Sequence, residues 1–291
     1  MKSKDMDKKR VVILFYKFVK INNPEDLRKK QKDLAESLNL TGRIILATEG
    51  INATLEGERG LIEKYKKELK KEKQFKDIVF KESGGTGISF PKLSVKVRDE
   101  IVALKAKSSD LSKDTANYVS AEELEEMYKN GEDFLVLDLR NNYEIACGKF
   151  DNTVDPDLEI FRELPEKVSA IEKYKDKKLV AVCTGGIRCE KATRLLRKKG
   201  FDNLYQLKDG IHTYMQEFPG SHFKGTLFVF DNRMKSDVVD VPQKTVIGTC
   251  IFCNEKTEDF YSDDSYRPSR KVLCCQDCVG SNGRNLRNVV S

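Results

Sequence analysis

Hydrophobic and polar residues follow two different patterns within the first hundred residues. Short apolar or alternating runs are typical of strands, and apolar residues recurring every three to four positions indicate helices. Strands are expected at 11–19, 42–46, the second half of 47–57, near 78–80 and 93–98, and helices after Pro24 and over about 61–72. This order of elements predicts a ferredoxin-like α+β domain, in which helices cover one face of an antiparallel sheet.

A polar segment rich in serine and lysine, 105–117, follows this domain and is expected to be a linker. Beyond it, apolar strands alternate with helices. The strands are expected at 134–137, 179–182 and 204–207, and the helices from Ser120, over 189–199 and from Asp209. Such alternation predicts an α/β fold with a doubly wound parallel sheet, and a site at the carboxyl edge of its strands.

The apolar run 179–182 leads into the loop Cys183-Thr184-Gly185-Gly186-Ile187-Arg188, which opens the helical pattern ending at Gly200. Backbone N–H groups of such a loop and the positive end of the helix dipole converge on one point and stabilise an anion there. We therefore expect Cys183 to be a nucleophilic thiolate with a lowered pKa. The glycines of the loop permit a sharp turn, and the guanidinium of Arg188 adds several hydrogen-bond donors in a fixed geometry. The alternative is a buried cysteine in an ordinary strand-to-helix turn.

Length and composition limit the class of protein. With 291 residues, 39% hydrophobic and 34% charged, the chain suits a soluble globular protein of two or three domains. Its sequence has no apolar run near the ~20 residues of a membrane span and begins without an apolar signal segment. We expect a cytoplasmic protein that does not enter a membrane.

Charge is distributed unevenly along the chain. The net charge is +6, yet residues 1–110 alone carry 26 Lys+Arg against 17 Asp+Glu. A basic N-terminal third is typical of proteins that bind a polyanion such as RNA. The alternative is a general richness in lysine, because acidic residues are interleaved through the same stretch.

Five of the eight cysteines lie after residue 249, in paired spacing. Cys250-x-x-Cys253 and Cys275-x-x-Cys278 supply four thiolates for a tetrahedral structural zinc site, while four reduced cysteines without metal are the alternative. Two histidines, His212 and His222, lie outside any metal-ligand pattern. This disfavours a Cys-His-Asp hydrolase and a two-His-one-carboxylate iron oxygenase. No nucleotide cofactor is evident.

Several segments resemble one family. The loop resembles that of rhodanese domains, where four residues separate the cysteine from the arginine. More narrowly, 183–192 is similar to the signature of the tRNA uridine hydroxylases, which convert the wobble uridine to 5-hydroxyuridine with molecular oxygen. Segments 49–54 and 100–102 and the Phe-Val-Phe-Asp-x-Arg motif at 228–233 resemble the same family. We therefore interpret the chain as an oxygen-dependent oxidoreductase, a tRNA uridine(34) 5-hydroxylase.

The resemblance implies a set of site residues and partners. Cys183 and Arg188 would be catalytic and 184–187 would support them. Beyond the loop, Asp138 and Arg140 would brace it, Arg162 would face the pocket, and Glu49 and Asn52 would contact the substrate. tRNA would be the partner and molecular oxygen the co-substrate. The source of electrons and the oligomeric state are not given by the sequence.

We expect a tRNA-binding domain at 1–107, a linker at 108–117, a rhodanese domain at 118–222 and a Cys-rich region at 223–291. Two rival functions would use the same residues. One is a sulfurtransferase that carries sulfur as a Cys183 persulfide. The other is a tRNA-binding adaptor without catalysis.

Overall fold

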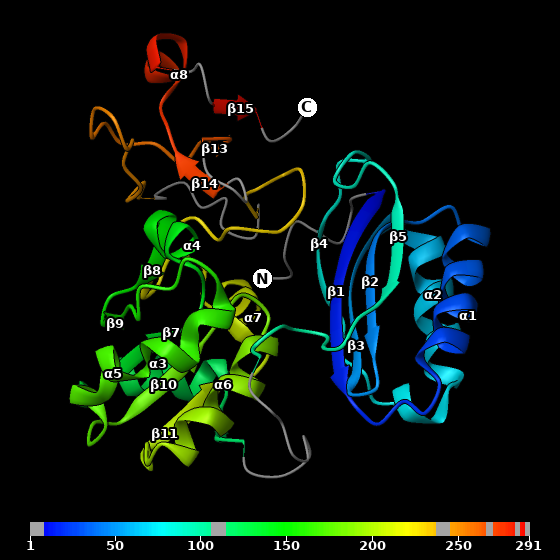
Figure 1. The fold of residues 1–291 in the computed structure, drawn as a ribbon, viewed down its shortest axis with the longest axis horizontal. Coiled ribbons are helices and arrows are strands. Elements are labelled where there is room, and N and C mark those ends of the chain that lie inside the picture. The colour runs from blue at the N-terminus through cyan, green and yellow to red at the C-terminus, as the bar shows by residue number, and fades with distance from the viewer. Residues whose placement is uncertain (1–8, 106–114, 237–244, 266–269, 283–285, 289–291) are drawn as a thin grey trace. The chain divides into compact units, whose positions relative to one another are not determined.

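The computed structural model describes residues 9–105, 115–236, 245–265, 270–282 and 286–288. The chain divides into two compact units, Met1–Thr115 and Ala116–Ser291 (Figure 1). Most of the linker expected at 108–117 lies outside the described residues. Each unit is described on its own below.

The first unit is a five-stranded sheet with two helices on one face (Figure 1). The strand order is β4-β1-β3-β2-β5, and every neighbouring pair is antiparallel except β2 and β5. The elements are β1 (Arg10–Phe18), α1 (Pro24–Ser37), β2 (Thr41–Ala47), β3 (Gly50–Glu58), α2 (Arg59–Lys71), η2 (Lys73–Phe75), β4 (Lys81–Gly84) and β5 (Leu93–Val97). The ferredoxin-like order expected from the sequence is therefore confirmed.

Local chemistry sets the ends of these elements. Helix α1 begins where the Asn23 side chain accepts a hydrogen bond from the Asp26 N–H at 3.2 Å, with Pro24 in the first turn.

The strand expected near 78–80 was placed too early, because β4 begins only at Lys81. Ile78 is instead buried in a turn that follows η2, with its N–H donating to the Phe75 carbonyl.

The second unit contains a five-stranded sheet in which all paired strands are parallel, in the order β6-β11-β10-β7-β9. Its first elements are β6 (Asn117–Val119), α3 (Ala121–Lys129), β7 (Leu135–Asp138), α4 (Asn142–Cys147), β8 (Gly148–Phe150), β9 (Thr153–Val154), η3 (Phe161–Glu163) and α5 (Leu164–Ile171). They are followed by η4 (Glu172–Tyr174), β10 (Leu179–Val182), α6 (Ile187–Lys198), β11 (Leu204–Leu207), α7 (Gly210–Glu217) and β12 (Phe223–Gly225). The parallel sheet expected from the sequence is confirmed.

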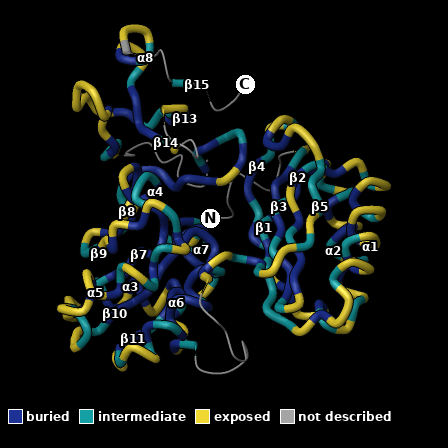
Figure 2. Tube along the Cα trace, viewed as in Figure 1, coloured by how far each residue is buried: buried dark blue, intermediate teal, exposed yellow. Residues whose placement is uncertain are grey.

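A small sheet of order β14-β13-β15 completes this unit, from β13 (Phe260–Asp263), β14 (Arg270–Leu273) and β15 (Leu286–Asn288), with α8 (Gln276–Asn282) beside it. An apolar cluster joins it to α4 and to the segment after β12; its members are Cys147, Phe228, Met234, Phe260 and Leu273. Figure 2 shows buried positions along the strands and exposed positions along the outer sides of the helices. No helix among the described residues is long and apolar enough to cross a membrane.

Candidate active site and candidate metal site

Strand β10 positions the loop that begins with Cys183. All four residues of β10 are buried, and the strand lies between β7 and β11 at the centre of the parallel sheet. The loop then turns at Gly186, whose φ of 95° is left-handed, directly before α6. Gly210 packs against the same loop, where an added Cβ would lie 2.7 Å from the Cys183 carbonyl oxygen. A side chain at position 210 would therefore displace the loop.

The sulfur of Cys183 is buried and surrounded by donors. The Gly186 N–H donates to Sγ at 3.2 Å, and the residue has no exposed surface. Burial by itself would raise the pKa of the thiol, but a hydrogen bond from the Cys189 thiol, the Arg188 charge and backbone N–H groups lower the pKa to about 6. Cys183 is therefore predominantly a thiolate at neutral pH.

Arg188 is paired with a buried carboxylate that the sequence analysis did not assign to the site. Its Nη1 and Nη2 donate to the two Glu144 oxygens, each at 2.8 Å, and Glu144 has no exposed surface. Thr184 Oγ1 and the Asn141 N–H donate to the same carboxylate at 3.3 and 3.0 Å. Burial opposes the charge of Arg188, but Glu144 outweighs it and raises the pKa of the guanidinium. The Cys183 loop is thereby tied to α4.

Asp138 and Arg140 form a second buried pair beside this one. Arg140 Nε and Nη2 donate to the Asp138 carboxylate at 2.9 and 2.6 Å, and neither side chain is exposed. Arg140 also donates to the Gly148 carbonyl at 2.6 Å and to the Glu144 carbonyl at 3.4 Å. Arg140 thus binds one carbonyl within α4 and one directly after its C-terminal end, and α4 in turn presents Glu144 to the loop.

The motif at 228–233 forms a tight turn that contacts Arg188. The backbones of Phe228 and Lys235 form an antiparallel β-bridge across the turn. The Asp231 carboxylate accepts hydrogen bonds from Arg233 Nε and Nη2 at 2.8 and 2.6 Å. The Phe230 ring lies 5.4 Å from the Arg188 guanidinium carbon, in a cation–π contact. The region after the parallel sheet therefore contributes a side chain to the Cys183 loop.

Three other residues expected at the site lie on other elements, Arg162 in the second unit and Glu49 and Asn52 in the first. Arg162 is exposed on η3. Glu49 accepts from the Ile101 N–H at 2.8 Å, and Asn52 donates to the Ile101 carbonyl at 3.0 Å. The two side chains therefore fasten the segment at 100–104 to the hairpin of β2 and β3. Their contact with a substrate stays a prediction.

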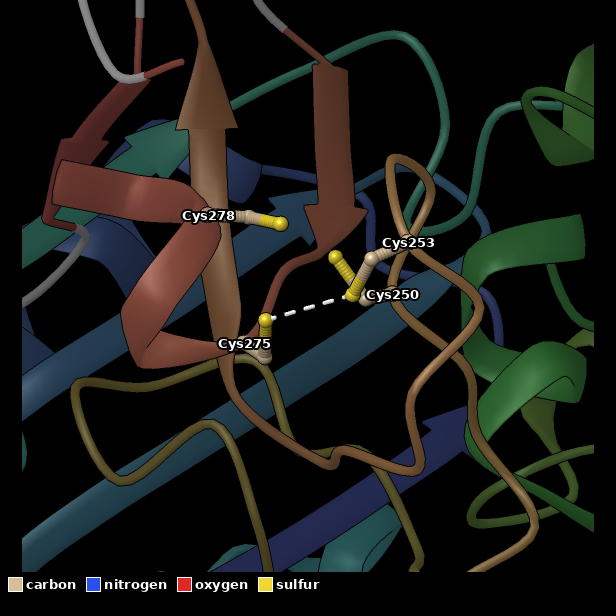
Figure 3. A group of neighbouring side chains, drawn as sticks. All are labelled: Cys250, Cys253, Cys275 and Cys278. Atoms are coloured by element: carbon tan, nitrogen blue, oxygen red, sulfur yellow. Dashed lines mark hydrogen bonds between the residues drawn. The ribbon is translucent and has the colours of Figure 1, made fainter. Parts of the chain in front are cut away.

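Four cysteines converge within the C-terminal region, and Figure 3 shows their side chains directed toward one another. The sulfurs of Cys250, Cys253, Cys275 and Cys278 all lie within 4.8 Å of one another. Four sulfurs at about 2.3 Å from a shared ion are the arrangement of a structural zinc site. The group could hold a metal ion.

Family models match the chain in three consecutive parts. A UPF0176 acylphosphatase like domain matches residues 10–101, a rhodanese-like domain matches 120–217, and a rhodanase C-terminal domain matches 224–286. The first match covers the sheet of the first unit, the second covers the parallel sheet, and the third covers the region that contains the cysteine cluster.

Curated relatives match over nearly the whole chain. A tRNA uridine(34) hydroxylase of Wolbachia pipientis wMel is 36% identical over 270 residues, covering 92% of this chain and 96% of that protein. A tRNA uridine(34) hydroxylase of Staphylococcus carnosus is 37% identical over 284 residues, covering 92% of this chain and 89% of that protein.

Proposed function

Because the chain belongs to the family of tRNA uridine(34) hydroxylases, we propose that it converts the wobble uridine of tRNA to 5-hydroxyuridine, with the Cys183 thiolate as the reactive group and molecular oxygen as co-substrate. The observation that carries this proposal is the environment of Cys183, a buried sulfur with a pKa of about 6 at the start of a donor-rich loop. It supports a nucleophile that is charged at neutral pH.

A chemical route follows from these groups. The thiolate adds to C6 of the uracil, which makes C5 electron-rich enough to react with oxygen. One oxygen atom enters at C5 and the other leaves as water, so the reaction takes two electrons and two protons from a separate reductant. The thiolate then leaves C6 as the C5 proton is lost. An oxidised or persulfidated Cys183 that carries the reactive atom is the alternative route.

The same loop would also serve the alternative function, a sulfurtransferase that carries sulfur as a Cys183 persulfide. The donors that stabilise the Cys183 thiolate, among them the Gly186 N–H and the Arg188 charge, would stabilise a persulfide anion as well. The hydroxylase is favoured because the relatives that match over nearly the whole chain are tRNA uridine(34) hydroxylases.

Nucleoside mass spectrometry tests the function. Total tRNA is compared between cells with and without this gene, in a strain that lacks any other route to 5-hydroxyuridine. The expected result is loss of 5-hydroxyuridine and its derivatives without the gene and recovery with the wild-type gene. Unchanged 5-hydroxyuridine would contradict the proposal and would direct attention to persulfide transfer.

We propose that the first unit binds tRNA through the sheet face opposite α1 and α2. Ile13 and Phe15 lie in the core under the helices, so the alternate side chains of β1 lie on the other face. Two rows of paired residues cross that face: Lys81, Leu14, Thr54 and Arg43, and then Tyr16, Asn52, Ile45 and Lys96. Arg43 and Lys96 are the exposed cations of these rows, whereas Lys81 is buried over the Tyr16 ring. Exposed cations on a sheet face suit the phosphates of single-stranded RNA.

Removing a cation from this face is expected to weaken tRNA binding. Arg43→Ala or Lys96→Ala should each lower the affinity and reduce the slope of log K against log salt by about 1, because a phosphate contact releases a counterion. Both side chains are exposed. Affinity is measured by fluorescence anisotropy across a salt series.

The matched control is Lys32→Ala, which removes an exposed lysine from α1 on the helical side of the same unit. Its salt slope should equal that of the wild type. An equal loss in all three variants would indicate diffuse attraction by net charge and would contradict the assignment of this face.

The cysteine cluster is proposed to hold structural zinc. Purified protein should contain one zinc ion per chain, and Cys253→Ser should lose it, because a tetrahedral site needs all four thiolates. Cys274→Ser is the matched control, since Cys274 is buried and its sulfur is 4.0 Å from that of Cys250 but lies outside the group of four. Metal content is measured by mass spectrometry. Zinc retained by Cys253→Ser would contradict the site.

Removal of the metal should also lower stability. Metal binding to a preformed site adds to the free energy of folding, so a strong chelator should lower the melting temperature of the wild type and leave that of Cys253→Ser unchanged. The melting temperature is measured by circular dichroism.

A further inference from the structure

Phe230 combines exposure with contact to the Cys183 loop. Its side chain is 47% exposed, whereas Phe228, two residues earlier in the same turn, is buried. The Phe230 ring touches Arg188 and meets Phe228 edge-to-face at 5.2 Å. Single exposed apolar side chains are common and carry no meaning alone. This one differs because it lies against the arginine of the reactive loop.

The turn that carries Phe230 is held by local contacts. The bidentate pair of Asp231 and Arg233 is almost fully buried, the Met234 N–H donates to the Asp231 carbonyl at 2.9 Å, and the Val229 N–H donates to the Met234 carbonyl at 3.1 Å. The backbone beneath the ring is therefore fixed, and the ring itself is the part that water reaches. Such a pre-positioned aromatic suits recognition, because little order is lost on binding.

We propose that Phe230 is a base-stacking subsite, and that the uracil of the wobble nucleotide stacks on its ring when it enters the Cys183 loop. This inference rests on the proposed function. An enzyme that acts on a base holds the extruded base between aromatic or apolar side chains, and base–aromatic stacking supplies much of the binding.

The burial of the sulfur explains why the subsite lies at Phe230. Cys183 has no exposed surface, so a base reaches it only after the side chains above the loop move. The contact between Phe230 and Arg188 is one that a base can replace, because a π-face that attracts a guanidinium also stacks on a flat ring. Arg188 stays in place through Glu144, and uracil adds no charge to the site.

Binding of anticodon stem-loop RNA tests the subsite. Each RNA carries either uridine or an abasic nucleotide at position 34, and binding to the full chain is measured without oxygen or reductant. The wild type should bind the uridine RNA about tenfold more tightly than the abasic RNA, as expected for one stacked base. Phe230→Leu should reduce this preference to about twofold or less, and Phe230→Tyr should keep it.

Phe252→Leu is the matched control, because Phe252 is a second half-exposed phenylalanine of the C-terminal region, at 45%. It should keep the tenfold preference. Phe230→Met is tested beside Phe230→Leu, and circular dichroism checks that each variant melts as the wild type does. If Phe230→Leu and Phe230→Met keep the preference, or Phe252→Leu loses it equally, the subsite is overturned.

The subsite and the function fail separately. A wild type that shows no preference for uridine overturns the stacking subsite, even if it restores 5-hydroxyuridine in cells. A wild type that fails to restore 5-hydroxyuridine overturns the function, whatever the binding assay shows.

Discussion

Replacing Cys183 by serine is expected to abolish 5-hydroxyuridine formation while tRNA affinity stays unchanged. In the proposed route the thiolate is the nucleophile, and a pKa of about 6 keeps it charged at neutral pH, whereas a serine hydroxyl in its place stays protonated. Removing the nucleophile of an enzyme costs on the order of 10⁴–10⁶-fold in rate. Product is measured by nucleoside mass spectrometry after reaction with purified tRNA, and affinity by fluorescence anisotropy.

A second buried cysteine provides the control for this substitution. Burial raises the pKa of the Cys147 thiol to about 12, and its sulfur lies 3.2 Å from the Glu144 and Thr226 carbonyl oxygens, either of which can accept its single S–H. Serine can make the same contacts, so Cys147→Ser should keep its activity. Formation of 5-hydroxyuridine by Cys183→Ser at the wild-type rate would rule out thiolate addition.

The pH dependence of the reaction has a defined sign. In the proposed route the reactive form is the Cys183 thiolate, which is present above its pKa and is lost as the pH falls through about 6. The rate should therefore be flat between pH 7 and 8 and decrease about tenfold for each pH unit below the pKa. In Arg188→Gln the midpoint should move to higher pH, because the stabilising positive charge is gone.

Replacing Glu144 by alanine should destabilise the second unit more than any surface substitution. It leaves the Arg188 charge buried without its partner, which costs about 3–5 kcal/mol of unfolding free energy. It also removes the acceptor for Thr184 Oγ1 and for the Asn141 N–H. Urea denaturation followed by circular dichroism measures the effect.

A double variant separates the unpaired charge from a general loss of packing. Glu144→Leu with Arg188→Leu removes both charges from the interior, so it should recover part of the stability that Glu144→Leu alone loses. If the double variant is as unstable as the sum of the single variants, the ion pair is not the cause. A loss below about 1 kcal/mol in Glu144→Ala would likewise contradict the buried pair, because surface pairs have that value.

The sequence was most informative where neighbouring residues act together. Strand 179–182 and strand 204–207 have the bounds expected from their apolar runs, and the capping sequence at Ser120 begins α3 as expected. The strand expected near 78–80 begins only at Lys81, because an apolar residue such as Ile78 can fill the core from a turn as well as from a strand. Hydrophobicity indicates that a residue is buried. The hydrogen bonds of its backbone decide whether the residue belongs to a strand or to a turn.

Glu144 and Phe230 could not be assigned to the Cys183 loop from the sequence. Glu144 lies 44 positions before Arg188, and the segment carrying Phe230 reaches the loop only after the chain has completed the parallel sheet. Asn141 and Glu144 have the spacing of a helix cap, a signal that explains the start of α4 but not the second use of the carboxylate.

The sequence by itself determined the order of the elements, the loop of Cys183 and the two Cys-x-x-Cys spacings of the C-terminal region. These features depend on residues close together in the chain, whose spacing fixes the local backbone. Tertiary structure alone decided which charge neutralises Arg188 and which ring lies over it. Those contacts depend on where distant segments meet, because burial makes an unpaired charge costly and selects its partner only once the chain is folded.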